Sequence, residues 1–377
     1  MKTEKGLEVY LGSDKVGILA ETSNHKVAFS YSDVWLEKGF SISPFSLPLK
    51  REVFVPSKLY FNGLFGVFAD SLPDAWGQLL LERIIKEHGE NISSYNVLER
   101  LAIVGTAGMG ALTYQPAYSI RLAESQADLD ELARQCQKIL LTEYAEKLDE
   151  LYQLGGTSGG ARPKIMTQIN DEYWIIKFPA HVDKQNSGKM EYDYSLCARK
   201  CGIEMTETKL FPSQTSSGYF GTKRFDRVVE EGRVRRRHVL TVSALLELDS
   251  EQPCLDYHSL MKLTKIITRD DEKELEKMYR LMCFNVYAHN RDDHAKNFSF
   301  IYDEERKKWH MSPAYDLTYS NTYYGEHTTT VDGNGKNPGM KDLVAVGKQA
   351  GMDKTRCERI AKEIEECVWC DLKEYLR

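Results

Sequence analysis

The chain has 377 residues and a mass of 43.2 kDa, with 42% hydrophobic and 28% charged residues. These proportions are ordinary for a soluble globular protein, and the length predicts two lobes or two to three domains of about 100–200 residues each. The net charge of −6 argues against a protein that mainly coats nucleic acid, although Arg233, Arg235, Arg236 and Arg237 form a local basic patch.

The sequence has no membrane or secretion signal that we can identify. No apolar run reaches the roughly 18–20 residues that a membrane span needs, and the first residues, MKTEKGLEVYLGSDK, contain no apolar signal region. We therefore expect a cytoplasmic protein with no membrane partner.

The eight cysteines are scattered along the chain, which indicates reduced thiols and not a disulfide framework. Cys367 and Cys370 form a CxxC pair, but a structural zinc site needs two more ligands and none is nearby in the sequence. We interpret this pair as one turn of a C-terminal helix.

The first part of the chain predicts short strands followed by a helix. Residues 7–60 read as strands, with a hairpin signal at Gly12, and residues 41–49, which are rich in Pro and Ser, are expected to be extended. From Pro73 onward, DAWGQLLLERIIKEHG has helical spacing and stops at Gly89, and GTAGMG (105–110) is expected to be a loop.

The second part changes from β-rich to helical. Residues 122–153 predict a helical or looped connector, and a Gly-rich loop then precedes a hairpin whose strands are 164–169 and 173–178. A further strand is expected to end at residues 223–226, and the chain is mostly helical after about Thr241. Residues 271–290 are apolar nearly all round in their second half, which predicts a buried helix.

The segment NRDDHAKN (290–297) follows this helix and has the spacing of a kinase catalytic loop. In protein kinases the loop reads H-R-D-L-x-x-x-N, and here Arg291-Asp292 is followed by Asn297 five residues after the aspartate. Asp316 lies 19 residues further on, after a predicted hairpin over FSFIYDEERKKWHM, where kinases place a second metal-binding aspartate. Asn297 and Asp316 offer the oxygen ligands that Mg²⁺ prefers.

The nucleotide side of a kinase site also has candidates. Gly155, Gly156, Gly159 and Gly160 would let backbone N–H groups approach a phosphate closely. Lys177 lies within a predicted strand, where a phosphate and a carboxylate such as Glu191 would compensate its charge.

Each of these features is weak alone, because Gly-rich loops are usually turns and polar loop residues are usually caps. Their order along the chain is the stronger observation, and it predicts a kinase that uses ATP and Mg²⁺.

Two rival readings remain open. The first is a hydrolase, because residues 156–160 match G-x-S-x-G around Ser158. The second is a metal hydrolase built on His289, Asp292, Asp293 and His294. The context disfavours the first, since a strand follows the motif where a helix is needed. The simpler reading of His294 is a residue that orients its neighbours.

The sequence resembles the HipA family of bacterial serine/threonine kinases, which are toxins of toxin–antitoxin pairs. The resemblance runs over nearly the whole chain, through FADSLPDAWGQLLLERI, GMGALTYQP, SGGARPK, WIIKFP, EYDYSLCARKCGI, KRFDR, DDHAKNFSF and PAYDL in the family's order. It implies an α/β, two-lobe protein-kinase-like fold with a β-rich N-lobe and a helical C-lobe. The segments would be an extra N-terminal subdomain (1–118), the rest of the N-lobe (119–226) and the C-lobe (227–377).

The family's roles can be carried onto matching positions. Asp292 would act as base or position the hydroxyl, His294, Lys296 and Asn297 would complete the catalytic loop, and Asn297 and Asp316 would bind Mg²⁺. Glu191 would support Lys177 by an ion pair. The ATP-binding residues implied are Ser158, Gly159, Gly160, Ala161, Lys164, Lys177, Lys223, Phe225 and Tyr315, with residues 223–225 as the hinge at the adenine. Family members also phosphorylate a serine before the Gly-rich loop, for which Thr157 and Ser158 are the candidates here, although both hydroxyls could simply bond to the backbone.

The resemblance further implies a bacterial toxin that a HipB-like helix-turn-helix antitoxin neutralises and links to DNA. The protein substrate would be an aminoacyl-tRNA synthetase such as glutamyl-tRNA synthetase. A departure from the family is Arg162-Pro163 before Lys164. The alternatives are a small-molecule or lipid kinase, a non-toxic HipA-like kinase and a non-catalytic nucleotide-binding protein.

Overall fold

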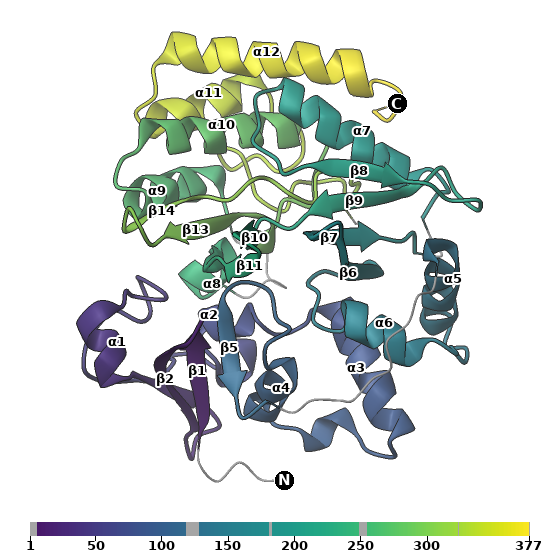
Figure 1. Ribbon diagram of the computed structural model, residues 1–377. Helices are drawn as coiled ribbons and strands as arrows, with labels where there is room; N and C mark the ends of the chain where they lie inside the picture. Colours follow the sequence, from purple (N-terminus) through teal and green to yellow (C-terminus); the bar gives the residue numbers. More distant parts are fainter. Residues whose placement is uncertain (1–5, 118–127, 181–182, 249–254, 323, 377) are drawn as a thin grey trace. The chain divides into compact units, whose positions relative to one another are not determined.

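The computed structural model describes residues 6–117, 128–180, 183–248, 255–322 and 324–376 (Figure 1). The chain forms two compact units, of which unit 1 is Met1–Gln185 with Phe211–Asp249 and unit 2 is Asn186–Leu210 with Ser250–Arg377. These units divide the chain differently from the segments 1–118, 119–226 and 227–377, because the chain enters unit 2 early and then returns to unit 1. Among the described residues, no helix is long and apolar enough to cross a membrane.

Unit 1 begins with an antiparallel five-stranded sheet of order β4-β3-β2-β1-β5. The hairpin predicted at Gly12 is confirmed, since Leu11 pairs with Asp14 across the turn. Leu7, Val9 and Phe29 are fully buried, and the ring of Phe29 lies 5.1 Å from that of Phe68 in α2. The strands are β1 (Leu7–Leu11), β2 (Asp14–Glu21), β3 (Val27–Tyr31), β4 (Val53–Phe54) and β5 (Leu112–Gln115), and the associated helices are α1 (Asp33–Lys38), α2 (Gly66–Ala69) and α4 (Val97–Val104).

The prediction that residues 41–49 are extended is wrong. The chain instead makes a turn in which the backbone N–H of Leu47 donates to the carbonyl of Ser43 over 2.8 Å. The hydroxyls of Ser43 and Ser46 also bond to each other at 2.8 Å, and Pro44 suits the second position of a turn.

A second sheet in unit 1 contains β6, β7 and β9 in that spatial order. The predicted hairpin is confirmed, with Asn170 and Asp171 at positive φ in the turn between β6 and β7. Trp76, Trp174 and Ile176 belong to a buried cluster that joins α3 and α6 to this sheet. The elements are α3 (Ala75–Glu87), α5 (Leu129–Leu140), α6 (Leu148–Gly155), β6 (Lys164–Ile169), β7 (Glu172–Lys177) and β9 (Tyr219–Lys223), followed by β10 (Arg227–Glu230), β11 (Arg233–Arg236), β12 (Val239–Thr241) and α8 (Val242–Leu246).

Unit 2 is mostly helical, as the sequence predicts. The expected buried helix is observed as α10 (Glu272–Tyr287), in which Met278, Met282 and Phe284 are fully buried, and α10 packs against α9, α11 and α12 (Figure 1). The predicted hairpin after the catalytic loop is also observed, as β13 and β14. The other bounds are α7 (Ser187–Lys200), β8 (Thr208–Phe211), α9 (Tyr257–Ile267), β13 (Ser299–Asp303), β14 (Lys308–Met311), α11 (Met340–Gln349) and α12 (Lys354–Leu372).

Candidate active site

The loop 290–297 leaves the end of α10 through a sharply turned and well-anchored segment. His289 has a left-handed backbone, with φ +51°, and the amide of Asn290 donates to Asn285 of α10 over 2.9 Å. Asn285 in turn donates to the hydroxyl of Tyr257 over 2.9 Å. Because Asn285 and Asn290 are both buried, these bonds hold the start of the loop in one place.

The two adjacent aspartates of the loop have opposite environments. The Asp292 side chain is 60% exposed, and its Oδ1 lies 4.0 Å from Nε2 of His294. Asp293 is fully buried and accepts hydrogen bonds from the Tyr257 hydroxyl at 2.9 Å, from Nδ1 of His327 at 3.0 Å and from the backbone N–H of Thr329 at 3.1 Å. Asp293 therefore holds the loop, whereas Asp292 is accessible to a substrate.

Asn297 and His294 stabilise the loop from within. The Asn297 amide donates to the backbone carbonyl of Asp292 over 2.7 Å, and Nδ1 of His294 accepts from the backbone N–H of Lys296 over 3.2 Å. The His294 bond caps the short 3₁₀ turn Ala295–Asn297. His294 thus orients its neighbours, as the simpler reading of the sequence holds.

Tyr315 connects the catalytic loop to the segment that carries Asp316. Its hydroxyl donates to the backbone carbonyl of Lys296 over 2.7 Å and also bonds to the hydroxyl of Ser299. Lys296 and Tyr315, which this bond joins, directly precede Asn297 and Asp316. The bond therefore ties the segment that carries Asn297 to the segment that carries Asp316. Asp316 has φ +54°, a conformation that aspartate tolerates better than most residues and that often occurs at functional positions. These two oxygen-bearing side chains are the ones that would hold Mg²⁺.

The Gly-rich loop connects α6 to β6 and is held by residues distant in sequence. Gly160, with φ +84°, donates its backbone N–H to Oδ2 of Asp74 over 2.8 Å and accepts from the backbone N–H of Trp76 over 3.3 Å. Asp74 and Trp76 lie at the start of α3. Sequence reasoning missed Asp74, because no local signal links a helix start to a loop over 80 residues later.

The two hydroxyls proposed for autophosphorylation are buried in this conformation. Thr157 is 9% and Ser158 is 1% exposed, and they donate to the carbonyls of Ala107 at 3.0 Å and Gly155 at 2.6 Å. Both side chains thus bond to the backbone. A hydrolase nucleophile of the G-x-S-x-G type is exposed on a turn from a strand into a helix. Ser158 is instead buried on a turn from a helix into a strand.

Lys164 and Lys177 lie directly opposite each other in the β6–β7 pair. Lys164 is buried and donates from Nζ to the carbonyl of Gly159, while Nζ of Lys177 lies 5.7 Å from the centre of the Phe220 ring. A Cβ atom at Gly160 would stand only 2.5 Å from Nζ of Lys164, so the glycine makes room for this ammonium beside the loop. Residues paired across two strands lie on the same face of the sheet, so the two lysines make that face favourable for a bound anion. The pair and the glycine loop thus fit the phosphates of ATP.

The predicted hinge follows the end of β9. Lys223 pairs with Trp174 across the sheet and its Nζ bonds to Glu172, while the backbone N–H of Arg224 donates to the carbonyl of Tyr173 over 2.7 Å. The backbone directly before Phe225 is therefore fixed to β7, the strand that carries Lys177.

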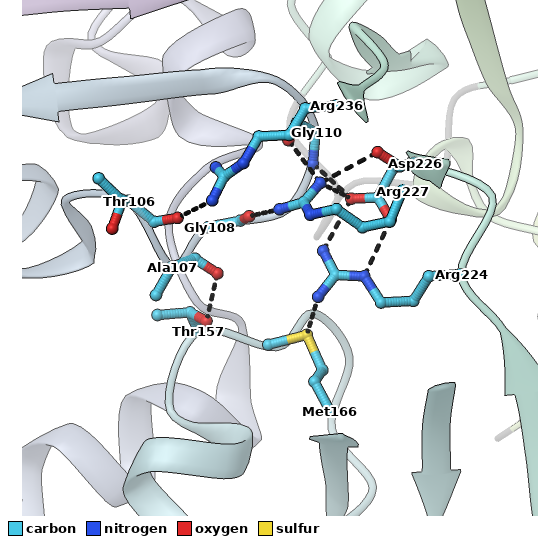
Figure 2. A network of polar contacts seen from close by, with 10 residues as sticks. All are labelled: Thr106, Ala107, Gly108, Gly110, Thr157, Met166, Arg224, Asp226, Arg227 and Arg236. Carbon is cyan, nitrogen blue, oxygen red and sulfur yellow. Dashed lines mark hydrogen bonds and ion pairs between the residues drawn. The ribbon is translucent and has the colours of Figure 1, made fainter. Parts of the chain in front are cut away.

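A buried ionic network behind the hinge was missed by sequence reasoning (Figure 2). Asp226 accepts two bonds from Arg224, at 2.9 and 2.8 Å, one from Arg227 at 2.7 Å and one from the backbone N–H of Gly110 at 2.8 Å. Arg227 also donates to the carbonyls of Gly108 and Gly110, both at 2.8 Å. Burial raises the pKa of Asp226, but the two guanidinium groups outweigh it and lower that pKa to about 2.

This network gives the GTAGMG loop a role. The loop bonds to Asp226 and Arg227 behind the hinge, and its Ala107 carbonyl accepts from Thr157 of the Gly-rich loop (Figure 2). Arg236 points inward and donates to the carbonyl of Thr106, so the basic patch expected at residues 233–237 is not a set of four free surface arginines. The loop therefore links the hinge to the Gly-rich loop.

The structure brings the predicted residues together as two sets. Unit 1 holds the Gly-rich loop with its exposed Ala161, the lysine pair and the hinge, and unit 2 holds the catalytic loop with Tyr315 and Asp316. Glu191 is buried in the second turn of α7 in unit 2, so its ion pair with Lys177 of unit 1 stays a prediction. Among the described residues, the ligand atoms of His289, Asp292, Asp293 and His294 are not found gathered within 4.8 Å of one another.

Comparisons with known proteins identify the family of the chain. The HipA N-terminal domain model matches residues 7–115, and the HipA-like C-terminal domain model matches residues 156–369. The protein "Putative kinase Y4dM" of Sinorhizobium fredii is 28% identical over 173 residues, which are 42% of this chain and 40% of that protein. The matched stretch thus spans less than half of that relative.

A solved structure of a HipA protein shares the fold. HipA from Shewanella oneidensis, in a complex with HipB and operator DNA, is similar over 98% of this chain and 90% of that chain, with a TM-score of 0.73 and 18% identity. The proinflammatory kinase CtkA of Helicobacter pylori is similar over 58% of this chain and 88% of that chain, with a TM-score of 0.39 and 15% identity, which is a weak likeness.

Proposed function

Because the chain belongs to the HipA family, we propose that it is a serine/threonine protein kinase that transfers the γ-phosphoryl group of Mg²⁺-bound ATP to a protein. The observation that carries the proposal is the Lys164–Lys177 pair beside the Gly-rich loop. It supplies two ammonium groups on paired strands next to a Gly-rich loop, and lysines beside such a loop are suited to binding a polyphosphate.

The residues of the catalytic loop divide the remaining work. The exposed carboxylate of Asp292 accepts the hydrogen of the attacking hydroxyl and orients its oxygen toward the phosphorus. The side-chain oxygens of Asn297 and Asp316 would hold Mg²⁺, which would neutralise charge on the phosphate oxygens. Asp293 and His294 keep this loop in place through their hydrogen bonds.

Regulatory autophosphorylation at Thr157 or Ser158 requires the Gly-rich loop to open. Both hydroxyls are buried and donate to backbone carbonyls, so neither can reach a phosphoryl donor in this conformation. Phosphorylation of either would place a dianion where these bonds now lie and would favour the open loop.

The proposed biological role is that of a bacterial cytoplasmic toxin. We infer a HipB-like helix-turn-helix antitoxin as partner, because the structurally similar Shewanella HipA is seen with HipB and operator DNA. DNA would then be contacted mainly through the antitoxin. The proposed substrate is an aminoacyl-tRNA synthetase such as glutamyl-tRNA synthetase, whose phosphorylation would inhibit translation and growth.

The test uses the purified full-length chain with γ-labelled ATP and Mg²⁺, followed by mass spectrometry of the protein and of a treated lysate. We expect label on serine or threonine with the wild type and none with Asp316→Ala or Lys177→Ala. Asp270→Asn is the matched control, because this carboxylate is 79% exposed and outside the site. No protein phosphosite with folded wild type, or full labelling by Asp316→Ala, would overturn the proposal.

A further inference from the structure

Three cysteine thiols from two helices of unit 2 converge on one point. Cys197 and Cys201 lie one turn apart on α7, and Cys367 lies on α12, which packs beside α7 (Figure 1). Their sulfur atoms all lie within 4.8 Å of one another. Within the part of the chain that the structure describes, this is the one group of three or more Cys, His, Asp or Glu whose ligand atoms gather so closely.

The spacing of these sulfurs suits a tetrahedral thiolate site. Zinc binds thiolate sulfur at about 2.3 Å, so two sulfurs on one ion stand roughly 3.8 Å apart. Cysteines at positions i and i+4 of a helix face the same side, and a third from a facing helix completes a triangle. The three thiols therefore need only small side-chain rotations to share an ion.

A carboxylate lies one helical turn from Cys367, outside the group of converging sulfur atoms, and would need to rotate to reach an ion. Asp371 follows Cys367 by one turn of α12, and its Oδ2 accepts a 2.6 Å bond from Nζ of Lys200 on α7. Asp371 can thus supply the fourth ligand, while Lys200 offsets part of the negative charge of four anionic ligands.

Ordinary core packing accounts for this group less well. Buried cysteines often serve as small apolar side chains, as Cys136 and Cys283 do here. In the cluster, however, three sulfur atoms from two segments converge within 4.8 Å of one another, which apolar packing alone does not require. Cys367 is also only partly buried, which leaves an ion a route to the two buried sulfurs.

We propose that Cys197, Cys201 and Cys367 bind a zinc ion, with Asp371 as the fourth ligand, and that this ion joins α7 to α12. Each thiol releases its proton to solvent when the ion binds, so affinity falls as the pH is lowered. The site is independent of the kinase chemistry, since none of its residues belongs to the catalytic loop or the Gly-rich loop. Its role is structural, because all four ligand positions are filled by the protein.

The experiment measures metal in full-length protein purified with reductant and without chelator. We expect about one zinc per chain by elemental analysis, and a cobalt–thiolate charge-transfer band when Co²⁺ replaces zinc. Cys367→Ser should lose the zinc and weaken the band. Cys370→Ser is the matched control, because this cysteine is exposed on the same helix outside the cluster, and it should retain both signals. Asp371→Asn should weaken binding without removing the thiolate band.

Several outcomes would overturn the site. Folded, reduced wild type without zinc and without the cobalt band would do so, and so would equal zinc loss in Cys370→Ser. A disulfide between two of the three cysteines would lower the mass of freshly purified protein by two hydrogens. Its detection would show that these cysteines form an oxidised pair and not a zinc site. If Cys367→Ser does not fold, the intensity of the wild-type cobalt band shows whether three thiolates bind the ion, because this intensity grows with the number of thiolates.

Discussion

Asp226 in unit 1 and Asp292 in unit 2 show two opposite uses of a carboxylate in one chain. Asp226 is 2% exposed and is surrounded by two guanidinium groups and a backbone N–H. The Asp292 side chain is 60% exposed, and its Oδ1 lies 4.0 Å from Nε2 of His294. A fully bonded carboxylate fixes backbone, whereas an exposed one beside a rigid loop is available to a substrate.

The largest expected effect is on activity, through Asp292→Asn. Removing a base or positioning carboxylate should lower kcat/KM for phosphorylation by about 10²–10⁴-fold. Because the side chain is exposed, the free energy of unfolding should change by less than about 0.5 kcal/mol. Phosphoryl-transfer kinetics measure the loss of activity, and urea unfolding of the same preparation measures the free energy of unfolding. Unchanged activity would remove Asp292 from the proposed mechanism.

Asp226→Asn should have the reverse pattern, with its main effect on stability. It leaves Arg224 and Arg227 buried without their counter-charge, which should cost about 3–5 kcal/mol of unfolding free energy in unit 1. Urea unfolding measures this. Glu230→Gln is the control, since its ion pair with Arg235 is 3.8 Å long and exposed, and it should cost less than about 0.5 kcal/mol. Equal stability of the two variants would contradict a structural role for Asp226.

Asp293→Asn sharpens the comparison, because this residue is the immediate neighbour of Asp292. It weakens hydrogen bonds from Tyr257, His327 and Thr329, which should destabilise unit 2 by roughly 1.5–3 kcal/mol. The Asp293 variant should thus unfold at lower urea than the Asp292 variant. A loss of activity at full stability would instead place Asp293 in the chemistry.

The smallest expected effect is the pH dependence that Asp226 contributes. Its folded pKa of about 2 lies below the ordinary value of 3.8, so its stabilisation is complete above about pH 4 and is lost as the pH falls toward 2. The loss should amount to about 2 kcal/mol. Unfolding free energies measured across this range should fall more steeply for the wild type than for Asp226→Asn. Parallel curves would show that Asp226 does not titrate in this way.

Local sequence patterns determined much of this protein. The hairpin over residues 164–177 follows from β-rich runs around Asn170-Asp171, and α10 follows from apolar residues at helical spacing. The order of the Gly-rich loop, Lys177 and the spacing of Asp292 to Asn297 predicted the kinase class before any contact was known. Such features are readable because their partners lie within a few residues.

Only the tertiary structure decided the roles that depend on distant partners. Gly110 and Asp226, Asp74 and Gly160, and the cysteines of α7 and α12 are far apart in the chain, so no spacing rule connects them. Adjacent Asp292 and Asp293 differ for the same reason, since burial and bonding partners come from other segments. Propensity and spacing describe one segment at a time, while burial and charge compensation are properties of several segments packed together.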